Sequence, residues 1–355
     1  MNATLAELGG WPGVLRPLLA HEDITADHAR AALAEVLEGA ATPAQLAAFV
    51  VALRMKGESV EEMSGLVAAM RGAAERVELA PGSVVVDTCG SGGGASRRRA
   101  AFNVSTIAGL VIAGAGVAVC KHGNRAASST SGSADLLEAM GVAIDLGPAG
   151  VARCVTEAGF GFCFAPRFHP AMRHAGPTRR EIGVPTVFNF LGPLANPAGV
   201  RHQVVGVSDP GMAERMVGVL QAEGAERALV VYGHDGLDEL TTTTTSTVLE
   251  LRDGGVRAAE VDPGELGIAS AEASAIRGGD AATNLALARN VLEGKPGPHR
   301  DLVLLNAAAG LVVGGLAAGL AEGYEAAVAS VDGGAAARVV ERVVAVSRQA
   351  ASVGA

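Results

Sequence analysis

Apolar side chains recur at helical spacing through the first eighty residues of the chain. Thr25 is placed to cap a helix that runs to about Glu38. Residues 42–45 and 59–62 are two capping boxes, in which a Thr or Ser precedes a Gln or Glu by three positions. The first box leads into an apolar stripe formed by Leu46, Phe49, Val50 and Leu53. The pattern predicts a small all-helical domain over residues 1–80, whose apolar faces need another element or a second subunit to cover them.

Beyond Pro81 and Gly82 the pattern changes to short apolar runs separated by helical stretches. The expected strands are residues 84–87, 117–121, 161–165, 203–207 and 228–232, with a helix from Asn103 to about Ala115. The tripeptide Asp253-Gly254-Gly255 lies between two apolar runs and predicts a hairpin. Strands that alternate with helices predict an α/β fold with a mostly parallel sheet covered by helices.

Residues 166–198 interrupt this alternation, because they carry few strand signals and many Pro and Arg residues. We expect helices and loops here that cross back to the helical domain. The predicted organisation is therefore a helical domain of residues 1–80, joined by 166–198, and an α/β domain of residues 81–165 and 199–355.

The charge and composition exclude several classes of protein. The 355 residues include 28 Lys and Arg against 37 Asp and Glu, a net charge of −9, which argues against nucleic-acid binding and against a polybasic membrane-surface protein. Two long uncharged stretches, 100–120 and 302–320, contain polar residues and glycines, so they predict buried core segments rather than membrane spans. The N-terminus lacks the basic and apolar regions of a signal peptide, and the four cysteines lack metal-binding spacing. We expect a cytoplasmic protein with reduced, buried thiols.

A glycine-rich loop begins where the first predicted strand ends. Gly90, Gly92 and Gly93 belong to it, and the polar residues Asn103, Ser105 and Thr106 begin the next helix. Glycine backbone amides and a helix N-terminus are suited to bind phosphate. The spacing matches neither the Walker loop nor the dinucleotide fingerprint, so an ordinary turn remains the alternative.

A second polar cluster follows the strand that ends at Lys121. It contains Lys121, His122, Asn124 and Arg125, and then Ser128, Ser129, Ser131 and Ser133. Parallel sheets bind ligands at the carboxyl ends of their strands, which favours a ligand site over a solvated loop.

Two further groups of charged residues are candidates. Local positive charge around Arg167, His169 and Arg179 suits a carboxylate- or phosphate-bearing substrate, whereas Arg173 and Arg180 are better interpreted as solvated residues of a helix surface. The adjacent acids Asp238 and Glu239 suit Mg²⁺, which takes one or two carboxylates together with substrate oxygens and water. Two solvated loop acids are the alternative.

Four long motifs together resemble the anthranilate phosphoribosyltransferases, enzymes of tryptophan biosynthesis with the type-III phosphoribosyltransferase fold. The motifs are KHGNRAASSTSGSAD (121–135), FAPRFHPAMRHAGPTRREIG (164–183), VFNFLGPLANPA (187–198) and GLDELTTTTTSTV (236–248). The resemblance implies a small helical domain joined to a larger α/β domain, and a homodimer formed through the helical part. It implies transfer of the phosphoribosyl group of phosphoribosyl pyrophosphate to the amine of anthranilate.

The resemblance also implies a role for individual residues. The donor, phosphoribosyl pyrophosphate, would bind Gly90, Gly92, Gly93, Asn103, Ser105, Thr106, Lys121, Asn124, Ser129 and Ser133. Anthranilate would bind Gly90, His122, Asn124, His169, Arg179 and Gly192, with Arg179 facing its carboxylate. Mg²⁺ would bind Ser105, Asp238 and Glu239. Lys121, Asn124 and Arg179 would be the catalytic residues.

The glycine-rich loop departs from the family pattern, which reads roughly GTGGDGxxTFNxST. This chain has GSGGGASRRRAAFNVST, so that Gly94 replaces an Asp, Ala101 replaces a Thr, and the stretch before Asn103 is three residues longer. The added Arg97, Arg98 and Arg99 could bind the pyrophosphate electrostatically, or could be a solvated insertion.

Three other functions stay open at this point. A paralogue could modify a different aromatic acid, which the altered loop allows. A nucleoside phosphorylase of related fold would use free phosphate, and the 164–198 match argues against it. A non-catalytic binding paralogue would not need Lys121, Asp238 and Glu239, which are all present.

Overall fold

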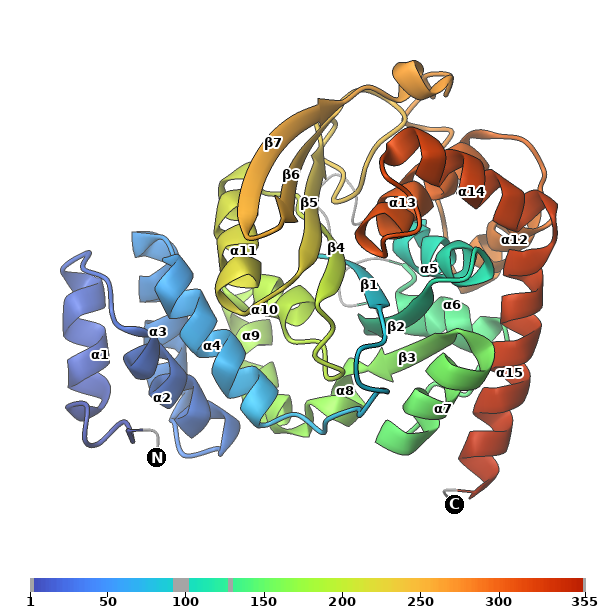
Figure 1. Ribbon diagram of the computed structural model, residues 1–355. Helices are drawn as coiled ribbons and strands as arrows, with labels where there is room; N and C mark the ends of the chain where they lie inside the picture. Colours follow the sequence, from blue (N-terminus) through green and yellow to red (C-terminus); the bar gives the residue numbers. More distant parts are fainter. Residues whose placement is uncertain (1–2, 92–101, 127–129, 354–355) are drawn as a thin grey trace.

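The computed structural model describes residues 3–91, 102–126 and 130–353, and Figure 1 shows how the elements are arranged. The first four helices are α1 (Gly10–Leu19), α2 (Ala26–Leu37), α3 (Pro43–Lys56) and α4 (Val60–Gly72). Thr25 caps α2, and both predicted capping boxes are present, with Thr42 paired to Gln45 and Ser59 to Glu62. The prediction of an N-terminal helical domain is therefore confirmed.

The larger part of the chain is built on a single seven-stranded sheet. Its strands are β1 (Val85–Gly90), β2 (Ala118–Gly123), β3 (Phe160–Phe164), β4 (His202–Gly206), β5 (Arg227–Gly233), β6 (Ser246–Arg252) and β7 (Gly255–Val261). Their order is β3-β2-β1-β4-β5-β6-β7. The pairs from β3 to β5 are parallel, and β6 and β7 are antiparallel. The mostly parallel sheet and the hairpin are therefore confirmed; the hairpin turn has positive φ at Asp253 and Gly254, as a tight two-residue turn requires.

The remaining helices connect and cover the strands. They are α5 (Val104–Gly114), α6 (Ser133–Ala139), α7 (Pro148–Ala158), α8 (Ala165–Phe168), α9 (Gly176–Ile182), α10 (Phe188–Leu194), α11 (Pro210–Ala222), α12 (Ala281–Leu292), α13 (Pro298–Val313), α14 (Leu320–Asp332) and α15 (Ala335–Val353).

Two apolar clusters pack against the sheet, and along β4 to β6 they lie on opposite faces. Side chains alternate along each strand, so Val204 belongs to one cluster and Val205 to the other. One cluster contains α5, α7, α13, α14 and α15, and the other contains α1 to α4, α10 and α11. The two uncharged stretches fall largely in α5 and α13, whose side chains are almost all buried, and no helix in the described residues is long and apolar enough to cross a bilayer. All four cysteines are buried and free, as expected.

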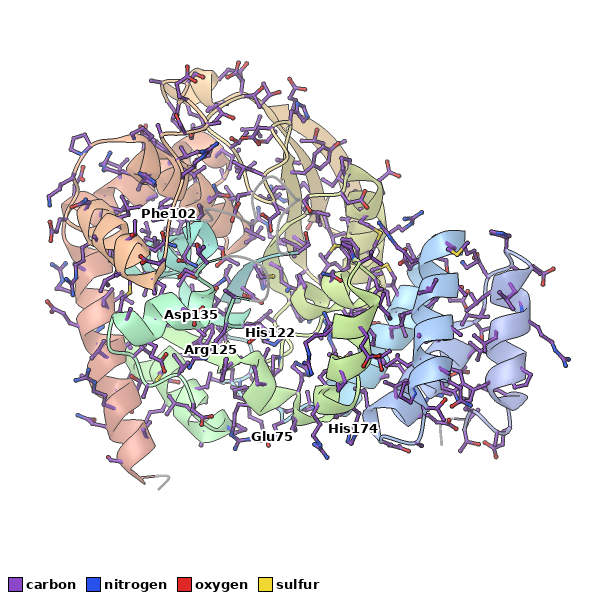
Figure 2. The ribbon with its side chains drawn as sticks, turned by 180° about the vertical axis from the view of Figure 1, so that it is seen from behind. Glu75, Phe102, His122, Arg125, Asp135 and His174 are labelled. Atoms are coloured by element: carbon purple, nitrogen blue, oxygen red, sulfur yellow. The ribbon has the colours of Figure 1, made fainter. Side chains whose placement is uncertain are left out.

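The segment from α8 to α10 lies against the N-terminal helices. Ala175, Phe188 and Leu191 share the apolar cluster of those helices, and α9 contacts α3 while α10 contacts α4. Figure 2 shows His174 and Glu75 near the base of the molecule, where this segment approaches the helical bundle. We propose on this packing that 166–198 belongs with residues 1–80; α11 shares the same cluster although it lies in the larger domain.

Candidate active site

The predicted site residues gather at the carboxyl ends of β1 and β4. The chain passes from β1 to β2 and β3 on one side and from β4 to β5 on the other, so the strand order reverses between β1 and β4. Such a switch point opens a crevice in which open α/β sheets bind their ligands. Gly90 and Gly206, the last residues of the two strands, are register partners at this point.

Asp238 lies directly on these two glycines. A Cβ added to Gly90 would come within 2.4 Å of Asp238 Oδ2, and one added to Gly206 would come within 1.5 Å of its carbonyl oxygen. Only glycine therefore lets the loop after β5 approach this closely. Asp238 is 5% exposed, so the fold holds this carboxylate in a fixed, largely dry position.

The three predicted metal residues line one small pocket. Ser105, Asp238 and Glu239 contribute to its wall together with Thr88, Gly206 and Asn306. The donors are all oxygen atoms, which suits Mg²⁺, and two carboxylates leave room for phosphate oxygens and water. Within the described ranges there is no cluster of three His, Cys, Asp or Glu side chains that could hold a metal ion.

Lys121 lies beneath this pocket as a buried cation. Its side chain is 1% exposed, and its Nζ donates hydrogen bonds to the carbonyl oxygen of Thr88 and, over 3.1 Å, to Ser105 Oγ. Burial lowers the pKa of Lys121, and the nearby Asp87 carboxylate opposes that change. The ammonium is therefore placed next to the predicted metal ligands.

The N-terminus of α5 is tied to two distant segments. Asn103 Oδ1 accepts hydrogen bonds from Ser131 Oγ at 3.2 Å and from Asn284 Nδ2 of α12 at 2.8 Å. Thr106 Oγ1 donates to Ser133 Oγ at 2.9 Å. These contacts join the start of α5, with Asn103 and Thr106, to the segment that contains Ser131 and Ser133; their role in binding the donor stays a prediction. No motif pointed to Asn284, because it lies 181 residues from its partner.

Several predictions lie outside the described residues. They concern Gly92, Gly93 and Ser129 of the donor set, and Gly94 and the three arginines Arg97, Arg98 and Arg99.

His122, His169 and Gly192 form a second part of the site. His122 Nδ1 lies 3.0 Å from the Gly192 carbonyl oxygen, and the rings of His122 and His169 are 5.1 Å apart. Since the carbonyl can only accept, Nδ1 carries the proton and Nε2 is left as an acceptor. That Nε2 is buried, and no described residue donates to it. Burial lowers the pKa of His122 to about 3 and also lowers the pKa of His169, so both rings are neutral at pH 7.

Arg179 lies over Phe188 of α10, the helix that also contains Gly192. Its guanidinium carbon lies 4.9 Å from the centre of the Phe188 ring, and burial lowers its pKa. Its side chain forms no hydrogen bond or ion pair with any residue that the structure describes. The other arginines suggested by the sequence differ, since Arg167 pairs with Glu75 at 2.5 Å and Arg173 is exposed.

Asn124 lies at the edge of the donor group, where its carbonyl oxygen accepts from the N–H of Ala134, the residue after Ser133, at 3.2 Å. It follows β2 as an exposed residue, and its Oδ1 accepts a hydrogen bond from the backbone N–H of Arg125 at 2.7 Å. Arg125 in turn pairs with Asp135 and Glu138, and Figure 2 shows Arg125 and Asp135 side by side. Among the described residues, no hydrogen bond joins Asn124 to Lys121 or Arg179.

Asp87 and Asn196 were not predicted as site residues. Asp87 is fully buried in β1, where its Oδ1 accepts from the backbone N–H of His122 at 3.2 Å and its Oδ2 from Asn196 Nδ2 at 2.8 Å. A carboxylate within an apolar strand was the sequence signal that could have revealed this network.

Comparisons with known proteins agree with this geometry. The helical bundle domain of the glycosyl transferase family matches residues 12–74, and the a/b domain of that family matches residues 82–337. The anthranilate phosphoribosyltransferase of Rhodococcus jostii (strain RHA1) is 52% identical over 338 residues, which cover 94% of this chain and 92% of that protein. That of Roseiflexus castenholzii is 50% identical over 327 residues, covering 92% and 95%.

Two solved structures extend the comparison to three dimensions. The crystal structure of anthranilate phosphoribosyltransferase from Thermus thermophilus has a TM-score of 0.88 at 41% identity, and covers 94% of this chain and 99% of that one. The enzyme from Saccharomyces cerevisiae, in complex with phosphoribosyl pyrophosphate and Mg, has a TM-score of 0.86 at 26% identity, and covers 96% and 98%.

Proposed function

Because the chain belongs to the glycosyl transferase family, among its anthranilate phosphoribosyltransferases, we propose that it transfers the phosphoribosyl group of phosphoribosyl pyrophosphate to anthranilate. In this reaction the C1–O bond to pyrophosphate breaks, a C1–N bond forms, and the amine gives up one proton. The observation that carries the proposal is the pocket at the sheet switch point, where Ser105, Asp238 and Glu239 meet above Lys121.

The donor half of the mechanism follows from charge. Ser105, Asp238 and Glu239 would hold Mg²⁺, which when bound supplies positive charge to the pyrophosphate. The buried ammonium of Lys121 is pre-oriented by its bonds to Thr88 and Ser105, so it stabilises negative charge on the leaving group without reorganisation. Gly90 and the polar start of α5 would bind the phosphates through backbone N–H groups and hydroxyls.

The proposed binding of anthranilate depends on the shape of the acceptor half of the site and on one cation. Arg179 would bind the anthranilate carboxylate, since its guanidinium has no anionic partner among the described side chains. A Cβ added to Gly192 would meet nothing within 4 Å, so this position leaves space beside His122. His122 and His169 are neutral and present a ring surface and one hydrogen-bond acceptor to the aromatic amine. Positioning rather than a protein base supplies the acceleration.

The homodimer is part of this proposal. Leu19 at the end of α1 and Met55 near the end of α3 are large apolar side chains that are 73% and 75% exposed, and α1 packs against α3. A second copy of this chain would cover them. The cytoplasmic location stays a prediction.

The deciding experiment is product identification. The protein is incubated with phosphoribosyl pyrophosphate, Mg²⁺ and a panel of aminobenzoates, and products are identified by mass spectrometry. We expect the phosphoribosyl adduct of anthranilate as the dominant product. Dominance of another aminobenzoate would indicate the specialised paralogue, and release of a base from nucleosides with inorganic phosphate would indicate the phosphorylase. Absence of any product would indicate a binding protein.

A further inference from the structure

Asn196 belongs to residues 192–196, which we call the acceptor segment, and its side chain lies between β1 and β2 next to Lys121. β1 and β2 pair at Val85–Ala118 and Val86–Val119. Beyond this point Asn196 Nδ2 donates to the Cys120 carbonyl oxygen at 2.8 Å, and Asp87 accepts from the His122 N–H. Two side chains therefore take over hydrogen bonds from the β1–β2 ladder.

Both the nitrogen and the oxygen of the Asn196 side-chain amide form hydrogen bonds. Its Nδ2 bridges Asp87 Oδ2 and the Cys120 carbonyl, both at 2.8 Å, and its Oδ1 accepts from the Ala198 N–H at 2.9 Å. Asn196 and Asp87 are 2% and 0% exposed. Removing either partner leaves a buried polar group unsatisfied, so the arrangement is strongly specified.

The same short stretch carries the acceptor side of the site. Gly192 accepts from His122, Ala195 accepts from His169, and Asn196 follows directly. In β2, Cys120 and His122 flank Lys121 in sequence. Asn196 donates to the Cys120 carbonyl oxygen, and Asp87 accepts from the His122 N–H. Burial raises the pKa of Asp87, and the nearby Lys121 opposes that change.

We propose that Asp87 and Asn196 form a positioning pair that fixes the acceptor segment 192–196 against the strand that carries Lys121. The inference rests on the proposed function, in which phosphoribosyl pyrophosphate binds near Lys121 and anthranilate binds near His122, Gly192 and Arg179. The pair touches neither substrate; it sets the distance between the two halves of the site.

The test uses two variants and one control. Asp87→Asn keeps the shape but leaves one acceptor oxygen, which cannot serve both the His122 N–H and Asn196 Nδ2, and Asn196→Ala removes the bridge. Ser330→Ala is the control, since its hydroxyl also makes one buried hydrogen bond, to the Val111 carbonyl at 2.8 Å, away from the site. We expect kcat to fall about 100-fold in both variants, the effect of a misplacement of about 1 Å, with a smaller change in either KM. The double variant should lose no more than the worse single variant.

A second readout does not depend on turnover. Hydrogen exchange of the peptide containing residues 120–123 should accelerate in Asp87→Asn, whose side chain cannot accept from both the His122 N–H and Asn196, and stay unchanged in Ser330→Ala. The proposed pair would be refuted by a normal kcat in either variant, by additive losses of kcat in the double variant, or by unchanged hydrogen exchange in a folded variant. If the wild type makes no product, the proposed function fails, and the exchange experiment still decides whether the pair holds β2. If Asn196→Ala does not fold, the isosteric Asp87→Asn carries both measurements.

Discussion

The half of the site proposed for phosphoribosyl pyrophosphate and the half proposed for anthranilate, the donor and acceptor halves, differ in the kinds of chemical group that form them. The donor half lies at strand ends and a helix N-terminus, and combines a buried ammonium with carboxylates and hydroxyls. The acceptor half joins His122 of β2 to the segment 166–196, which contains no strand, and combines two neutral imidazoles, backbone carbonyls and one arginine. A polyanion is recognised by charge fixed on a rigid sheet, whereas a flat aromatic acid needs a shaped wall and a single cation.

The difference also concerns how each half is held. The carboxylate of Asp238 is fixed by close contact with two glycines of the sheet. The acceptor segment is fixed by long-range side-chain bonds, such as that of Asn196 to Asp87, whose residues are 109 positions apart. Substitutions of the donor groups should therefore abolish chemistry, whereas substitution of Arg179, the acceptor cation, should mainly weaken binding of the acceptor.

The largest effect is expected from the metal acids. Replacing both Asp238 and Glu239 by Ala removes the carboxylates proposed for Mg²⁺, and we expect kcat to fall at least about a thousandfold, since one preorganised electrostatic contact is worth about 10²–10³. Initial rates at saturating Mg²⁺ measure this. Asp253→Ala, an exposed hairpin acid, serves as control. Near-normal turnover of the double variant would remove the assignment.

The acceptor cation should produce a smaller and more selective loss. Arg179→Ala removes a charged hydrogen bond worth about 1.5–3 kcal/mol, so the KM for anthranilate should rise about 10- to 150-fold. The KM for phosphoribosyl pyrophosphate should change little. The neighbouring, exposed Arg180→Ala is the matched control. Equal rises of both KM values would show that Arg179 does not serve the acceptor alone.

The neutral imidazoles should make stability depend on pH. Between its unfolded pKa near 6.5 and its folded pKa of about 3, His122 binds a proton only when unfolded, so the free energy of unfolding falls as pH falls. From pH 6.5 to 5 this group should contribute a loss of about 2 kcal/mol. Urea unfolding of wild type and His122→Gln measures it, and the variant should show a shallower pH dependence. An unchanged slope, or the same change in exposed His174→Gln, would contradict this interpretation.

The smallest catalytic effect is expected at the apolar surface of α1 and α3. Replacing Leu19 and Met55 by Glu should convert the proposed dimer to monomers, measured by light scattering after size exclusion. Both positions lie outside the two halves of the site, so kcat should stay within about twofold, the usual range of a surface substitution. A monomeric wild type would refute the dimer, and a large loss of kcat would mean that the partner subunit supports the site.

Local signals made much of the fold predictable from sequence. The capping boxes at Thr42 and Ser59 and the hairpin at Asp253-Gly254 involve groups within a few residues of each other, so the local sequence determines them. Alternation of apolar runs with helical periods determined the parallel sheet, because strands buried on both faces need continuous apolar residues. The motif residues that follow strands, such as Lys121 and Asp238, could be placed near one sheet edge for the same reason.

The tertiary structure alone decided which residues meet. The strand order brings Gly90 and Gly206 together beneath Asp238, and the return of the acceptor segment brings Asn196 to Asp87. Asn103 gains its partner Asn284 from a helix near the other end of the chain. No local pattern encodes these contacts, because they depend on the order of the strands and on the packing of distant elements rather than on neighbours in sequence. The sequence thus determined the elements and the type of chemistry, and the packing decided the distances at which that chemistry operates.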